Sequence, residues 1–114
     1  MPDLIYWAIP STDVEKSSAF LAELFGWTMT PSTDDYMMFT TGDGVPGGIE
    51  KATEPAPRGV SVYVGVDDIP ATLAKVESLG GEVVQPKTAV GGDHGYWGAL
   101  RDPGGTWLGV WSKD

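Results

Sequence analysis

The chain has 114 residues, enough for one domain of the usual size of about 100–150 residues with a core of its own. It contains no cysteine, which excludes disulfides, thiolate metal sites and a cysteine nucleophile. Seven Lys and Arg residues oppose 16 Asp and Glu residues, a net charge of −9, so nucleic acids and anionic membranes are poor partners. No apolar run is long enough to span a membrane and the start lacks a basic secretory leader, so we expect a cytoplasmic protein.

The first half of the sequence predicts a β-α-β-β-β unit. An apolar strand is expected over residues 4–9, followed by a helix over 13–25 that Asp13 caps and Gly26 ends. Three further strands are expected over 27–31, 36–41 and 47–50, separated by turn residues. The apolar stripe of the helix is predicted at Val14, Ala19, Leu21, Leu24 and Phe25.

The second half repeats this pattern at an offset of 55 residues, which places Asp13 on Asp68 and Gly26 on Gly81. A strand is expected over 60–66 and a helix over 68–79, with an apolar stripe that includes Leu79. The remaining strands are predicted at 82–85, 95–101 and 106–111. The fold class is therefore α+β, with one module at about 1–52, a linker at 53–59 and a second module at about 60–114.

Three segments carry a likeness to a known family: DVEKSSAFLAELFGW at 13–27, ESLGGEVV at 77–84 and RDPGGTWLGVW at 101–111. With the tandem β-α-β-β-β pattern, the chain resembles the vicinal oxygen chelate superfamily, which includes glyoxalase I, bleomycin resistance proteins and extradiol dioxygenases. The resemblance implies a single domain in which the two modules form a curled mixed sheet with a helix on its convex face and a cavity on its concave face.

Strand alternation sorts residues between these two faces. In the strand at 60–66 the four valines at even positions, from Val60 to Val66, are predicted to face the helix. That leaves Ser61 and Tyr63 toward the cavity. In the last strand, Leu108 and Val110 are predicted to pack under the helix, and the residues predicted toward the cavity are Trp107, Gly109 and Trp111.

Metal-using members of the superfamily place four ligands on the cavity face, and the resemblance assigns those positions to Tyr6, Glu50, Ser61 and Gly109. Only Glu50 is a good ligand for a divalent cation, so we expect neither a metal nor another cofactor. Glu50 itself is either a solvated carboxylate at a strand end or a lone carboxylate in the pocket that acts as a base.

The single histidine, His94, lies in a glycine-rich loop and is either an acid–base group or an exposed loop residue. A stacking pocket for a neutral or cationic molecule is predicted from the aromatic residues Tyr6, Tyr63, Trp107 and Trp111. The alternative is that these rings only fill the cavity as core residues. Trp7, Trp27 and Trp97 are interpreted as packing residues.

The leading hypothesis is a glyoxalase/bleomycin resistance-like protein that binds a small organic molecule in an aromatic-lined cavity without metal. Its predicted ligand-binding residues are Tyr6, Ser61, Tyr63, Trp107, Gly109 and Trp111. The alternative is a lyase, isomerase or dioxygenase that uses a weak metal site or Glu50 as base, and a third option is a module for protein–protein contact. The resemblance also implies a homodimer.

Overall fold

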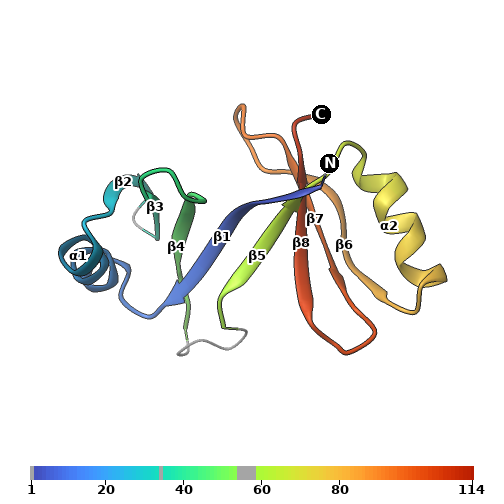
Figure 1. The fold of residues 1–114 in the computed structure, drawn as a ribbon, viewed down its shortest axis with the longest axis horizontal. Helices are drawn as coiled ribbons and strands as arrows, with labels where there is room; N and C mark the ends of the chain where they lie inside the picture. The colour runs from blue at the N-terminus through green and yellow to red at the C-terminus, as the bar shows by residue number, and fades with distance from the viewer. Residues whose placement is uncertain (1, 34, 54–58) are drawn as a thin grey trace. The chain divides into compact units, whose positions relative to one another are not determined.

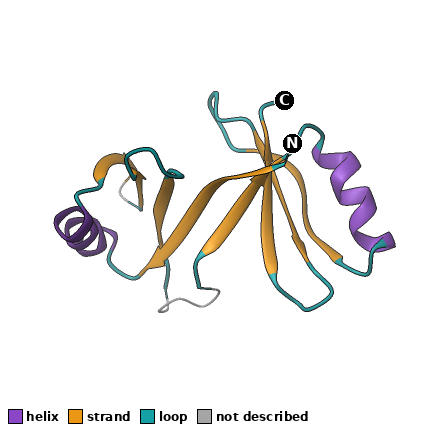
Figure 2. Cartoon of the chain, viewed as in Figure 1, coloured by secondary structure: helices purple, strands orange, loops and turns teal. Residues whose placement is uncertain are grey.

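The chain forms the two β-α-β-β-β modules that the sequence predicts (Figures 1 and 2). The structure is a computed structural model that describes residues 2–33, 35–53 and 59–114. Its elements are β1 (Asp3–Ser11), α1 (Val14–Phe25), β2 (Thr28–Thr33), β3 (Tyr36–Thr40), β4 (Gly47–Lys51), β5 (Ser61–Gly65), α2 (Ile69–Ser78), β6 (Glu82–Ala89), β7 (Tyr96–Arg101) and β8 (Trp107–Ser112). Most of the predicted linker at 53–59 lies outside the described residues.

The chain divides into two compact units. The first unit is Tyr6–Ser61, and the second unit is Val62–Asp114 together with Met1–Ile5. In the first unit the strand order is β2-β3-β4-β1, with β1 and β4 parallel and the other pairs antiparallel. In the second unit the order is β5-β8-β7-β6, with β5 and β8 parallel and the other pairs antiparallel. Each unit is therefore a mixed sheet with one helix, as the α+β prediction requires.

Both helices begin at the predicted caps. The Asp13 carboxylate accepts from the backbone N–H of Lys16 at 3.0 Å, and the Asp68 carboxylate accepts from that of Ala71 at 2.9 Å. Gly26 ends α1 in the left-handed conformation at φ 75°, where its N–H donates to the Ala22 carbonyl. These local signals fix the helix boundaries to within a residue of the prediction.

Each helix covers one face of its own sheet. Under α1 the core consists of Val14, Phe39 and Ile49, and the Trp27 ring stacks on Phe39 at 5.1 Å between centroids. Trp7 packs edge-on against the same rings, and its indole N–H donates to the Val45 carbonyl at 3.0 Å. Trp7 and Trp27 are thus packing residues, as predicted.

The corresponding core under α2 joins three helix residues to β8. Ile69, Leu73 and Val76 are buried against Val110, and Val66 packs on the same cluster. The opposite face of each sheet is consequently the one that can carry a site.

Several predicted core residues are exposed. Leu24 is 57% exposed, because it lies about 80° round the helix from Val14 and outside the face that contacts the sheet. Phe25 and Leu79 are exposed because they stand at or beyond the last helical residue, and Val60 is exposed because it precedes the first residue of β5.

Ala19 is also exposed, on the outer side of α1. The buried position of this turn belongs to Ser18, whose hydroxyl donates to the Val14 carbonyl at 2.7 Å.

Within the described part of the chain, neither helix is long and apolar enough to cross a membrane.

Candidate functional site

The predicted site residues are divided between the two units. Tyr6, Glu50 and Ser61 belong to the first unit, and the residues that belong to the second are Tyr63, Trp107, Gly109 and Trp111. That all of them surround one cavity stays a prediction. Each group is therefore considered within its own unit.

In the first unit, two tyrosines and a carboxylate share the sheet face that lies away from α1. Tyr36 is the cross-strand partner of Glu50, while the next residue, Met37, packs into the core under α1. Because alternate residues of a strand face opposite sides, Tyr36 and Glu50 lie on the open face. The Tyr36 hydroxyl is hydrogen-bonded to the Tyr6 hydroxyl.

Gly48 makes room for this hydroxyl pair. A Cβ atom at position 48 would overlap the phenol groups of both Tyr36 and Tyr6. The absence of a side chain at Gly48 therefore lets two polar aromatic tips meet over β4, two residues before Glu50.

The environment of the Tyr6 phenol favours its neutral form. Burial raises the pKa of Tyr6 above its ordinary value of 10.0, the hydrogen bond with Tyr36 lowers it, and the negative charge of Glu50 raises it again. The net direction is upward, so Tyr6 is a neutral hydrogen-bonding group at physiological pH. Ser61, the third predicted residue of this unit, is only 4% exposed at the start of β5 and offers little surface to a ligand.

In the second unit, an aromatic pair occupies the corresponding face. Tyr63 on β5 is the parallel-strand partner of Gly109 on β8, and a Cβ atom at Gly109 would lie within 3.0 Å of three Tyr63 ring atoms. The Trp107 ring meets Tyr63 edge-on at 5.7 Å and 79°. Both rings are half-buried. A tyrosine therefore lies over a glycine of the last strand in each unit.

Trp111 stands further along the same face of β8 and is oriented by the loop that contains His94. Its indole N–H donates to the His94 carbonyl at 2.8 Å, and Gly95 leaves the space that the indole ring occupies. The His94 side chain is exposed, and it is the backbone carbonyl of this residue that holds the Trp111 indole. Trp97 is the cross-strand partner of Trp111 and shares its face, which the interpretation of Trp97 as a packing residue did not anticipate.

The four positions that the resemblance assigns to metal ligands do not fit a divalent metal ion. Gly109 has no side chain, and the Tyr63 ring fills the space where one would begin. Tyr6 and Ser61 would supply hydroxyl groups, which are weaker ligands for such an ion than carboxylate or imidazole. Throughout the described ranges, no three His, Cys, Asp or Glu side chains come together in a group that could hold a metal.

Tyr36 is the residue that the sequence reasoning missed. Its strand was predicted, but its place beside Tyr6 and Glu50 depends on the register between β3 and β4, which no local pattern specifies. Tyr36 could have been identified as the cross-strand partner of Glu50 only if the turn between β3 and β4 had been known.

The fold is that of a glyoxalase-like protein, and comparison with known families agrees. A family model described as a glyoxalase-like domain matches residues 7–110, and the chain belongs to this family.

Sequence relatives support the assignment. CFP32 of Mycobacterium tuberculosis is 30% identical over 115 residues, which are 93% of this chain and 44% of that protein. The anthracycline biosynthesis protein DnrV of Streptomyces peucetius is 30% identical over 128 residues, 95% of this chain and 46% of that protein. The chain thus spans slightly less than half the length of these curated relatives.

Solved structures share the fold at low sequence identity. A glyoxalase/bleomycin resistance protein/dioxygenase superfamily member from Vibrio splendidus aligns with a TM-score of 0.71 and 17% identity over 98% of this chain and 99% of the other. A methylmalonyl-CoA epimerase from Mycobacterium tuberculosis aligns with a TM-score of 0.72 and 13% identity over 97% and 87% of the two chains. At these identities the similarity establishes the fold.

Proposed function

We propose that this glyoxalase-like protein binds a small planar organic molecule against the Tyr63 and Trp107 rings of the second unit, without a resident metal. The observation that carries the proposal is the pair itself, two half-buried aromatic rings packed edge-on over a glycine. Such rings offer a flat apolar surface on which a planar ligand can stack.

The chemistry of the donor set supports binding without metal. The position that would have to supply a ligand side chain from β8 is Gly109, and an aromatic ring covers it. A metal-dependent reaction would need at least three donors around one ion, whereas Glu50 is the one strong donor among the four family positions. The ligand is therefore held by stacking and hydrogen bonds.

The relative named for anthracycline biosynthesis suggests the kind of probe to use, a planar hydroxyanthraquinone. We expect it to quench tryptophan fluorescence saturably. Trp107→Leu should weaken its binding by about five- to thirtyfold, the equivalent of about 1–2 kcal/mol for a lost stacking surface.

Tyr96→Leu is the matched control. Tyr96 is an exposed aromatic residue of the same unit whose ring lies under the Lys87 ammonium, so its loss removes an aromatic ring without touching the Tyr63–Trp107 pair. Equal losses of affinity in Trp107→Leu and Tyr96→Leu would overturn the proposal, as would binding that requires an added transition metal.

A second candidate function is metal-free proton transfer with Glu50 as the base. The observation that favours it is the Tyr6–Tyr36 hydroxyl pair on the face that carries Glu50. In such a reaction the carboxylate removes a proton from a carbon next to a carbonyl group, a phenol O–H donates to the developing enolate oxygen, and the carboxyl group returns the proton.

This candidate is tested by deuterium exchange of an acidic C–H compound such as acetylacetone in heavy water. Glu50→Gln should abolish any exchange above the uncatalysed rate, and Tyr36→Phe should reduce it. Exchange that is equally fast with wild-type protein and Glu50→Gln would exclude Glu50 as the base.

We also propose that two copies of the chain associate, as the family resemblance suggests. Two large apolar side chains of α1 lie outside the face that contacts the sheet, with Phe20 63% and Leu24 57% exposed. Association that covers these side chains removes apolar surface from water.

A further inference from the structure

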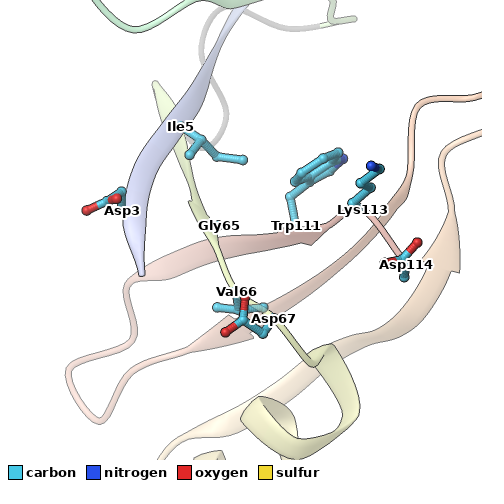
Figure 3. Close-up of a pocket in the computed structure, with 8 residues that line it drawn as sticks. All are labelled: Asp3, Ile5, Gly65, Val66, Asp67, Trp111, Lys113 and Asp114. Atoms are coloured by element: carbon cyan, nitrogen blue, oxygen red, sulfur yellow. The ribbon is translucent and has the colours of Figure 1, made fainter. Parts of the chain in front are cut away.

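A separate pocket lies at one end of the second unit, where the first residues of β1 meet the ends of β5 and β8 (Figure 3). Its volume is ≈ 380 Å³, within the range of about 300–1,000 Å³ that is usual for small-molecule sites. Trp111 stands four residues from Trp107 along β8, or about 13 Å in an extended strand. Neither Tyr63 nor Trp107 is among the residues that line the pocket.

The apolar residues that line the pocket are Ile5, Gly65, Val66 and Trp111. Figure 3 shows Ile5 and Trp111 projecting to the same side of the Gly65 backbone. A Cβ atom at Gly65 would lie 3.1 Å from the Ile5 side chain, so the glycine keeps the space between the two side chains open. Because the Trp111 indole N–H is already donated to the His94 carbonyl, what the ring offers a ligand is its π surface.

The polar part of the pocket is predominantly negative. The residues that line it include Asp3, Asp67 and Asp114 against Lys113, so their side chains carry a net charge of −2. None of these four side chains belongs to the Lys16–Asp13 or Lys51–Asp35 ion pair. The charge of the whole chain, −9, has the same sign.

We propose that this pocket binds a small organic cation, with an alkylammonium group over the Trp111 ring, in the negative potential of the aspartates that line the pocket. An indole face attracts a cation through its quadrupole and favours one of low charge density. The carboxylates do not form a group that could hold a metal ion, as far as the structure describes the chain, so a compact inorganic cation lacks a coordination shell here. An anion would meet the net negative charge.

Choline and its uncharged carbon isostere are a matched pair of probes, because they have nearly the same shape and differ in the charge. Nitrogen–proton NMR of the five tryptophan indole groups gives the readout, and the Trp111 signal is the one that Trp111→Phe removes. We expect choline to shift the Trp111 signal saturably and the isostere to bind about two- to fivefold more weakly or worse, the range of an exposed cation–π contact.

Three substitutions separate a site from a general charge effect. Asp67→Asn should weaken choline binding by about two- to fivefold, and Lys113→Gln should strengthen it by a similar factor, since each changes one charge next to the ligand. Glu77→Gln is the control, because it removes one negative charge at the far end of α2, about 15 Å from Asp67 along the helix. It should leave choline binding unchanged.

The inference is wrong if the isostere and choline shift the Trp111 signal equally, if choline causes no saturable shift, or if Asp67→Asn and Glu77→Gln weaken binding alike. Its failure is distinguishable from failure of the proposed function, because Asp67→Asn should leave hydroxyanthraquinone binding unchanged. Loss of both ligands in Asp67→Asn would show that the pocket and the Tyr63–Trp107 pair are not independent sites, and would overturn the inference.

Discussion

Substitution of Gly109 by alanine tests whether the Tyr63 ring really occupies the position of a side chain on β8. The added Cβ atom would lie within 3.0 Å of three ring atoms, closer than atoms in real structures approach. Either the ring leaves its preferred rotamer or the strands move apart, and overpacking of this kind costs about 1–3 kcal/mol.

The net effect is smaller than the overpacking cost, because alanine also restricts the unfolded chain. Replacing a strand glycine with alanine is worth about 0.5–1 kcal/mol where the backbone permits it. Gly109 is not among the glycines with positive φ, so the gain applies there. We therefore expect Gly109→Ala to lower the free energy of unfolding by about 0–2.5 kcal/mol, and Tm by about 4 °C for each kcal/mol lost.

The decisive measurement is a double-mutant cycle that combines Gly109→Ala with Tyr63→Val, with the free energy of each variant obtained from urea unfolding. Valine suits a strand and removes the ring, so in that background Gly109→Ala should be neutral or stabilising by up to about 1 kcal/mol. The coupling energy between the two positions should then be about 1–3 kcal/mol. If Gly109→Ala costs the same with and without the Tyr63 ring, the ring does not occupy that space and the argument against a metal ligand there fails.

Four further outcomes are expected. Folding raises the pKa of Tyr6 above 10.0, so the neutral phenol contributes its full stabilisation below pH 10.0 and loses it as pH rises through the folded-state pKa. The difference in the free energy of unfolding between wild type and Tyr6→Phe should therefore become smaller over that pH range. Purified protein should contain less than one equivalent of transition metal and keep its Tm in EDTA; one nickel, zinc or iron per chain by elemental analysis would contradict this. The double variant Tyr6→His with Ser61→His should gain a zinc site with Glu50, with saturating metal adding about 2.7 kcal/mol at 100 times Kd; no gain over wild type would mean that the three positions do not converge. Sedimentation should give twice the chain mass of 12.1 kDa, and a species of the single-chain mass at micromolar concentration would exclude the dimer.

The order of elements could be predicted because its signals are local. Asp13 and Asp68 cap their helices through hydrogen bonds to residues three positions away, and Gly26 ends α1 by adopting a positive φ. Such features depend on a few neighbouring residues, so a sequence repeat at a fixed offset is enough to find them twice.

The features that sequence did not reveal depend on how elements meet. Which side of α1 faces the sheet decides that Ser18 is buried and Leu24 is not, although a hydropathy pattern favours the opposite. The placement of Tyr36 beside Glu50, and of Trp97 beside Trp111, follows from strand register. Register is set by turns and cross-strand packing, which no single segment contains.

The tyrosine that lies over Gly109 also constrains how this chain can change over generations. A single substitution that gave position 109 a ligand side chain would first have to displace the Tyr63 ring, and the resulting loss of stability would fall on a protein that had gained no metal. Removing the ring first would leave an unfilled space on the sheet and sacrifice the contact with Trp107. Either order passes through a less stable intermediate, so each of the two residues raises the stability cost of replacing the other.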